Sequence, residues 1–386
     1  MASILNNAQN TNIHGGTFII NDKKGTAPSL DVLYKRVASN AILNAGGRAD
    51  EVRCHPGTRK EVISRIEKWR DAPEGLTTSV FWLSGPFGAG KSAIVQTIAE
   101  RCNEQGAPQA NFFFFRTDIS RNSVSPLVAT LLHQVILLYP SVRETVATVL
   151  SANPLIFDCL LEEQLAQLIV VPLRAVQKSS ASYRPLVLLI DGLDECDSDS
   201  KAGQQRILRA FDNVLVKQRH GVCLFRLLVA SRVEPQISMS FKRLSTPFLP
   251  LYLNDDYSPE TDIRLFITDE FKKVKSTHLL AYTLDETWPS VEDIDGIVEK
   301  SSGQFIYAAT VMRFISNSSA SPMLSLGKVQ GVSESAGTSS PFSQLDAIYT
   351  YILSRADDQQ ALKDIFHAHS YSTNIKPQDP FIATHS

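Results

Sequence analysis

The stretch Gly85-Pro-Phe-Gly-Ala-Gly-Lys91-Ser92 constrains this chain more than any other. It fits the pattern G-x-x-x-x-G-K-[ST], in which a glycine-rich loop joins a strand to a helix. The run from Ser79 to Ser84 before it is short and β-prone, and the run after it carries Ile94 and Ile98 at helical spacing. The alternative is an ordinary glycine-rich turn with an exposed lysine, which the flanking patterns disfavour. The sequence therefore predicts a strand, a loop and a helix in direct succession.

This loop has the chemistry of a phosphate cradle. Its glycines permit backbone angles that a Cβ would block, so that successive N–H groups can turn inward. The N-terminal end of the following helix adds positive field. We expect Lys91 to reach the β- and γ-phosphate oxygens and the Ser92 hydroxyl to bind Mg²⁺. The predicted nucleotide contacts are Gly85, Pro86, Phe87, Gly88, Ala89, Gly90, Lys91, Ser92 and Ala93.

A second predicted strand ends in acidic residues. Leu186 to Ile190 is a continuous aliphatic run, which is typical of a strand buried on both faces of a parallel sheet. The carboxylate of Asp191 then lies at the carboxyl edge of the sheet, where ligands bind. We expect Asp191 to hold Mg²⁺ through water opposite Ser92, and Asp194 or Glu195 to orient or deprotonate the attacking water. A solvated acidic loop is the alternative, which the upstream phosphate loop disfavours.

Three further runs complete the predicted sheet. Ala110 to Phe115 is an aromatic core strand, and Leu224 to Ser231 repeats the buried-strand pattern. Thr246 to Leu253 contains two prolines, which confine it to an edge or a bulge. Arg232 follows the fourth run, where a cation beside the γ-phosphate would stabilise its charge; a surface residue or ion-pair partner is the alternative. The predicted fold class is α/β, a P-loop NTPase with a five-stranded, mainly parallel sheet flanked by helices.

Composition excludes several classes of function. The net charge of −2 and the pI near 6.5 give no electrostatic footprint for nucleic acid. The longest apolar runs are far shorter than the roughly 20 residues of a membrane-spanning helix, and the polar start does not resemble a signal peptide. Five scattered cysteines without C-x-x-C pairs argue against a zinc site and a disulfide framework. We expect a cytoplasmic protein with no nucleic-acid partner and no membrane span.

Two segments precede the phosphate loop. Residues 1–28 are rich in Asn and predict a flexible N-terminal arm, with a strand that pairs with another copy of the chain as the alternative. Residues 29–75 predict a helical lead-in. Its first helix runs from Ser29 to about Ala45, and its second begins behind a capping box formed by Thr58 and Glu61.

Three motifs together resemble the NACHT class of signal-transducing ATPases with numerous domains (STAND): GPFGAGKS, LVLLIDGLDE and VASRVE. The lead-in CHPGTRKEVISRIEKW is similar to that of NOD-like receptors of mushroom-forming fungi, and the resemblance runs from about Arg53 to Ala356. It implies a role in signal transduction and innate immunity, with ATP as the commoner nucleotide; the residues leave ATP versus GTP open. It also implies that the arginine-bearing strand lies between the loop strand and the acidic strand. The residues that would then converge on one Mg–nucleotide are Lys91, Ser92, Asp191, Asp194, Glu195 and Arg232.

Residue patterns and this resemblance together divide the rest of the chain. The predicted segments are a NACHT core at 76–255, a helical lid at 256–317, a flexible linker at 318–341 and the start of a truncated winged-helix module at 342–386. The resemblance implies that the lid packs over the nucleotide and changes angle with its phosphate state. Members of this class continue into ligand-binding repeats, and the sequence shows no repeat.

These features leave three interpretations of function. The first is a slow NTPase that works as a switch: nucleotide exchange reorients the lid, exposes a surface for homo-oligomer formation and lets the N-terminal arm signal. The second is a truncated protein that binds nucleotide without switching. The third is a turnover ATPase such as a small-molecule kinase or a helicase, for which neither a substrate motif nor a basic track is visible. We favour the switch, with Mg²⁺ and ATP or GTP as its cofactors.

Overall fold

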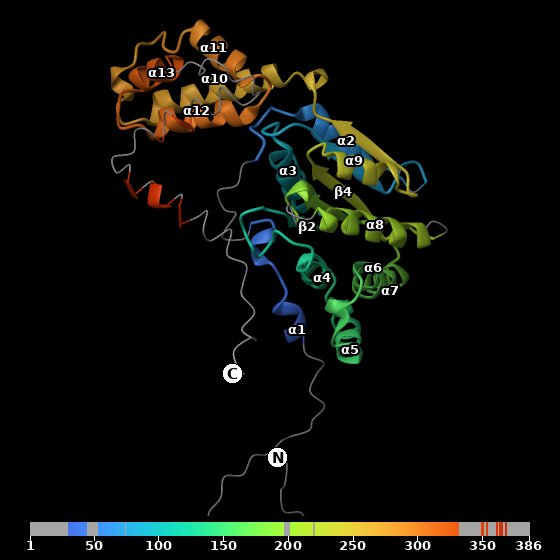
Figure 1. Cartoon of the computed structure of the whole chain (residues 1–386). Coiled ribbons are helices and arrows are strands. Elements are labelled where there is room, and N and C mark those ends of the chain that lie inside the picture. Colours follow the sequence, from blue (N-terminus) through green and yellow to red (C-terminus); the bar gives the residue numbers. More distant parts are fainter. Residues whose placement is uncertain are drawn as a thin grey trace, which may run out of the picture.

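The computed structural model describes residues 30–44, 53–73, 75–196, 201–218 and 221–331, together with scattered residues between 349 and 368. The predicted N-terminal arm and nearly all of the predicted winged-helix segment lie outside the described residues. Figure 1 shows a core that contains the sheet and, on one side of it, a separate group of helices near the end of the described chain.

A five-stranded parallel sheet forms the centre of the core. Its order is β2-β3-β4-β1-β5, and each neighbouring pair runs parallel. The strands are β1 (Val80–Ser84), β2 (Gln109–Phe113), β3 (Leu186–Asp191), β4 (Phe225–Ser231) and β5 (Phe248–Tyr252). The prediction of five strands is confirmed, as is the place of β4 between β1 and β3. The proline-containing β5 lies at an edge, as expected.

Alternate residues of each strand supply two hydrophobic layers. In β3, Leu186, Leu188 and Ile190 belong to one layer, and Val187 and Leu189 to the other. Two helices cover the second layer, namely α2 (Lys60–Asp71) and α3 (Lys91–Glu104). The helices of the first layer are α4 (Leu127–Leu138), α5 (Arg143–Ala152), α6 (Leu161–Leu165), α7 (Val171–Ser179), α8 (Ala202–Lys217) and α9 (Pro235–Lys242). Burial on both faces explains why the strands read as continuous apolar runs.

The first helix of the lead-in is much shorter than predicted. Only Asp31–Tyr34 (α1) is α-helical, and a single 3₁₀ turn follows at Ser39–Ala41. The backbone N–H of Ala38 donates to the Thr130 hydroxyl of α4 at 2.9 Å instead of continuing the helix. A tertiary partner therefore overrides the local helical spacing.

The capping box expected at the start of α2 is also wrong. Arg59 is the N-cap, in a left-handed conformation, and the Thr58 hydroxyl donates to the carbonyl of His55. The N–H of Arg59 donates to Oδ2 of Asp262 at 2.9 Å. In the expected capping box the N–H of Thr58 would bond the carboxylate of Glu61, but it donates to the carbonyl of His55 at 3.0 Å. The start of the helix is held instead by Asp262, a residue distant in sequence.

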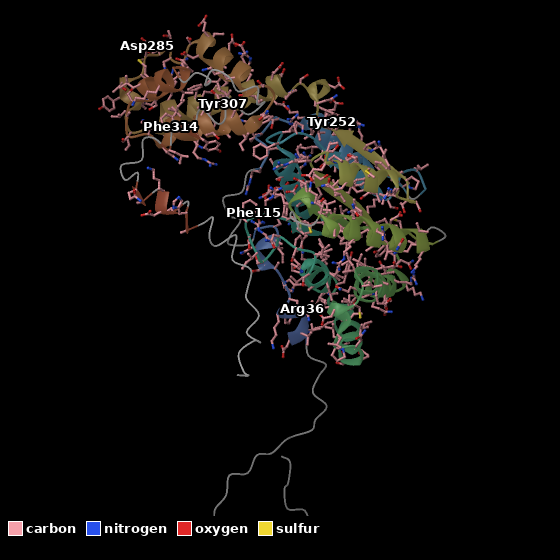
Figure 2. All side chains as sticks on the ribbon, in the orientation of Figure 1. Arg36, Phe115, Tyr252, Asp285, Tyr307 and Phe314 are labelled. Carbon is pink, nitrogen blue, oxygen red and sulfur yellow. The ribbon has the colours of Figure 1, made fainter. Side chains whose placement is uncertain are left out.

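Four helices share a hydrophobic core of their own and extend beyond the predicted lid segment; we call this group the lid. They are α10 (Pro259–Thr277), α11 (Val291–Ser301), α12 (Phe305–Asn317) and α13 (Pro322–Gln330). Tyr307 and Phe314 lie on α12, away from Arg36 at the far end of the core (Figure 2). Helix α13 corrects the first part of the expected flexible linker at 318–341, and residues 332–341 lie outside the described residues. Leu326 and Val329 of α13 are buried in the lid core, and this burial outweighs the Ser- and Gly-rich composition of the segment.

No single helix in the described part of the chain is both long and apolar enough to cross a membrane. The described cysteines, at positions 54, 102, 159, 196 and 223, are all free thiols.

The edge strand β2 depends on one buried side chain of α4. Gln134 Oε1 accepts the N–H of Asn111 at 3.0 Å, and Gln134 Nε2 donates to the carbonyl of Asn111 at 2.8 Å. Both residues are buried. The glutamine thus satisfies the two backbone groups that a neighbouring strand would otherwise pair.

We predict that Gln134→Leu lowers the free energy of unfolding by about 2–4 kcal/mol, because it leaves two buried backbone groups without partners. Urea denaturation measures the effect. Gln167→Leu on a partly exposed face is the matched control, expected to change stability by no more than about 0.5 kcal/mol. Equal effects of the two substitutions would contradict this role of Gln134.

Candidate functional site

A cavity of about 380 Å³ opens at the carboxyl edge of the sheet, between the phosphate loop, the segment before α2 and the lid. The two strands that carry acidic and basic residues end at this edge because all the strands run parallel. The predicted site residues that line the cavity are Phe87, Gly88, Gly90, Lys91, Ser92, Ala93, Asp191, Asp194, Glu195 and Arg232. The structure therefore brings the three predicted motifs together in one place.

The phosphate loop connects β1 to α3, as the sequence predicts. Gly88 and Gly90 have φ values of 72° and 88°, which other residues adopt only with strain. Gly90 is the N-cap of α3, and its first turn has no side-chain cap. The N–H groups of that turn are consequently available to an anion.

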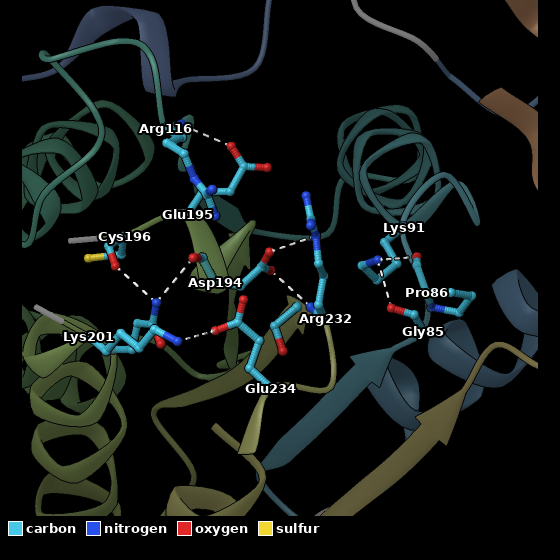
Figure 3. Close-up of polar contacts among 12 residues, drawn as sticks. Gly85, Pro86, Lys91, Arg116, Asp194, Glu195, Cys196, Lys201, Arg232 and Glu234 are labelled. Carbon is cyan, nitrogen blue, oxygen red and sulfur yellow. Dashed lines mark hydrogen bonds and ion pairs between the residues drawn. The ribbon is translucent and has the colours of Figure 1, made fainter. Parts of the chain in front are cut away.

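Lys91 folds back onto this loop (Figure 3). Its Nζ donates to the carbonyl of Gly85 at 3.0 Å and to the carbonyl of Pro86 at 2.7 Å. Burial lowers the pKa of Lys91, and the nearby carboxylates of Asp194 and Asp191 oppose that shift. The ammonium therefore lies between the loop and the acidic end of β3.

Asp194 and Arg232 form an ion pair inside the site. Asp194, only 3% exposed, accepts the backbone N–H of Arg232 at 2.9 Å, and its other oxygen lies 3.1 Å from Arg232 Nε (Figure 3). Gln204 of α8 donates to the backbone carbonyl of Asp194 at 3.1 Å. The guanidinium of Arg232 also lies 4.7 Å from the ring centroid of Phe87. The alternative weighed for Arg232, an ion-pair partner, describes its contact with Asp194 in this structure. Its separate contact with Phe87 links it to the phosphate loop.

Glu195 is held by a different element. Its Oε2 accepts the backbone N–H of Arg116, just beyond β2, at 2.9 Å. Burial raises the pKa of Glu195, and the bond from Arg116 opposes the shift. Both oxygens of Asp194 contact Arg232, so Glu195 is the better placed of the two carboxylates to accept a proton from water.

The donor set fits magnesium bound together with phosphates. Ser92 and Asp191 both line the cavity and offer a hydroxyl and a carboxylate oxygen. Among the residues that the structure describes, no group of three or more His, Cys, Asp or Glu side chains could hold a metal on its own. Mg²⁺ in phosphate sites takes one or two protein oxygens and completes its shell with water and phosphate. When bound here, it would neutralise charge on the phosphate oxygens.

The sequence interpretation expected the lid over the nucleotide but assigned to the site none of the residues that form the other half of the cavity. His55 and Arg59 line it from the segment before α2, and Phe266 and Phe305 line it from the lid. His55 Nε2 lies 3.0 Å from Asp269 Oδ2 of α10, which ties the lead-in to the lid. No local pattern indicates these residues, because their roles depend on elements far away in sequence.

The parallel sheet with its central arginine strand, the glycine loop before α3 and the acidic end of β3 define the core as a P-loop NTPase.

Residues 57–232 match the family described as Nephrocystin 3, N-terminal. The match begins just before α2 and ends at Arg232, so it contains the phosphate loop and both charged strand ends. It supports the P-loop ATPase part of the predicted resemblance. No protein of curated function matches the sequence.

Several solved structures resemble the chain in fold. A Walker-type ATPase of Pyrococcus abyssi has 12% identity and a TM-score of 0.46, over 83% of this chain and 80% of that one. The ORC2 protein of Aeropyrum pernix has 13% identity and a TM-score of 0.39, over 71% and 66%. PCH-2 of C. elegans has 11% identity and a TM-score of 0.39, over 81% and 74%.

The raised pKa of Glu195 predicts a pH-dependent stability. A carboxyl with a higher pKa in the folded state binds more protons when folded, so unfolding becomes easier as the pH rises above the ordinary value of 4.5. Glu195→Gln cannot ionise and keeps an oxygen for the N–H of Arg116. Relative to the wild type, this variant should gain free energy of unfolding between about pH 4 and about pH 7. Urea denaturation at both values measures the difference, and a pH-independent difference would contradict the prediction.

Proposed function

We propose that this protein is a nucleotide-binding switch of the NOD-like receptor type, which binds Mg²⁺ with ATP or GTP and hydrolyses the nucleotide slowly. One observation carries the proposal: a single cavity is lined by the phosphate loop, by the acidic end of β3, by Arg232 and by α12 of the lid. Such a cavity would place phosphates against both the catalytic groups and a helix outside the core. It supports coupling between the chemistry and the position of the lid.

Each predicted residue has a role in this proposal. The N–H groups of the loop and Lys91 bind the β- and γ-phosphates, and Ser92 and Asp191 hold Mg²⁺. Glu195 orients the attacking water. Arg232 stabilises charge on the γ-phosphate, and Asp194 positions that arginine through its two contacts.

The contacts of Glu195 and Arg232 support slow turnover. Glu195 is bonded to the N–H of Arg116, and Arg232 is paired with Asp194. Each group must leave or adjust a protein partner before it acts on the phosphate. A switch requires slow hydrolysis, because the nucleotide must stay bound long enough for the active conformation to act on its partners.

The position of the lid would depend on whether the bound nucleotide carries a γ-phosphate. Its helix α12 lines the cavity, and Ile306 of α12 packs against the phosphate loop at Gly88. A change of lid angle would alter the surfaces available for self-association. In this proposal residues 76–255 are the NACHT core, the lid extends to the end of α13, and residues 342–386 begin a winged-helix module of a cytoplasmic receptor in innate immunity.

We predict that Lys91→Ala lowers nucleotide affinity at least about 100-fold, because it removes the charge-assisted bonds to the phosphates. A titration with fluorescent diphosphates of adenosine and guanosine measures the affinity and also identifies the preferred base. Lys242→Ala, at an exposed position at the end of α9, is the control and should bind as the wild type does. Unchanged affinity in Lys91→Ala would remove the phosphate-loop assignment.

The variant Glu195→Gln should bind nucleotide as tightly as the wild type and hydrolyse it at least about tenfold more slowly, since the amide cannot accept a proton from water. Phosphate release in single-turnover conditions measures the rate separately from binding. A rate equal to that of the wild type would show that Glu195 is not the water-orienting carboxylate.

A further inference from the structure

Arg59 is buried at the junction of three elements. It is 5% exposed and precedes α2, yet its guanidinium reaches both the phosphate loop and the lid. Its Nη2 donates to the carbonyl of Ala89 at 3.0 Å. Its guanidinium carbon lies 4.9 Å from the ring centroid of Phe305 on α12. One cation thus contacts the loop that cradles phosphate and the helix that covers it.

The guanidinium of Arg59 is buried in an unfavourable environment. Its Nε and Nη1 are buried and have no hydrogen-bond partner among the residues that the structure describes. Burial also lowers the pKa of Arg59, while the charge of Asp262 opposes the shift. A buried donor without a partner loses the hydration that it has in the open, so docking of Phe305 over Arg59 carries a penalty. The docked lid is therefore held by contacts that must outweigh this penalty.

Some of those contacts come from the phosphate loop itself. Phe87 packs against the hydrophobic core of the lid, and a Cβ placed on Gly88 would collide with Ile306 Cγ2. Movement of α12 must consequently change the packing of the loop. Helix α10 is tied to the lead-in independently of this guanidinium, through the bonds of Asp262 to the N–H of Arg59 and of Asp269 to His55.

We propose that Arg59 is a positioning residue through which the lid controls the phosphate loop. With Phe305 docked, the guanidinium is confined against the carbonyl of Ala89 and fixes the loop; when α12 moves away, water reaches the guanidinium and its hold on that carbonyl weakens. Lid position and nucleotide affinity are then coupled in both directions. This inference rests on the proposed function, since it assigns the loop to a nucleotide.

The test uses the full chain and the substitution Arg59→Met, which keeps a long apolar stem and removes the charge and the donors. Lys60→Met is the matched control, at the adjacent, exposed position of α2. Affinity is measured by titration with the fluorescent diphosphate that the wild type prefers. We expect Arg59→Met to lose at least about tenfold in affinity, the scale of one charged hydrogen bond, and Lys60→Met to lose none.

A second measurement separates coupling from a merely structural role. Hydrogen exchange of the α12 amides is followed without nucleotide and at saturating nucleotide. We expect the nucleotide to change this exchange in the wild type and in Lys60→Met, but not in Arg59→Met, although its site is filled. An equal response in Arg59→Met, or no response in the wild type, overturns the coupling. A wild type that binds no nucleotide overturns the proposed function as well.

If Arg59→Met does not fold, Phe305→Leu gives the same test from the side of the lid. It removes the ring over the cation and leaves Arg59 and the loop unchanged. We expect a loss of nucleotide affinity although no residue of the loop is altered. Affinity equal to that of the wild type would overturn the proposal. A double-mutant cycle with Arg59→Lys then shows whether the two residues act together, and additive effects would contradict their coupling.

Discussion

The parallel pairing of β4 between β1 and β3 is the constraint on which the site depends. Register matches Ser84 with Ser231 and Ile190 with Val229, so the loop, the acidic run and the arginine leave the sheet at one edge. Those groups come from separate parts of the sequence, with Asp194 and Arg232 38 residues apart, and they meet only because three strands end together. Burial of apolar side chains on both faces of the sheet stabilises this arrangement, and the charged groups of the site lie at the carboxyl ends of the strands.

Opposite charges lie close together in the site. Lys91 and Arg232 lie among the carboxylates of Asp191, Asp194 and Glu195, and burial shifts the pKa of Lys91 downward and that of Glu195 upward. A phosphate group adds negative charge to this cluster, which favours release of the cations from their protein partners toward it. In the proposed switch, phosphate binding would therefore move these cations, and binding would be coupled to a change of state.

The sequence could predict whatever depends on local chemistry. The run that ends at Asp191 reads as a buried strand because both of its faces are apolar, and the glycines before Lys91 mark a loop that other residues cannot form. The start of α2 could not be predicted, since Asp262 supplies its cap from the lid. Arg59 was missed for the same reason: its position in the chain resembles a surface helix start, and its partners Ala89 and Phe305 become neighbours only in the folded molecule.

The most direct measurement of the central claim combines nucleotide content and turnover in one preparation. The purified chain is denatured, the released nucleotide is identified, and phosphate release is followed with added Mg–ATP or Mg–GTP. A switch predicts a tightly held diphosphate and a turnover below about one per minute, because enzymes of metabolism run at roughly 1–10³ per second. Turnover in that faster range, or a protein that neither contains nor binds nucleotide, would contradict the account.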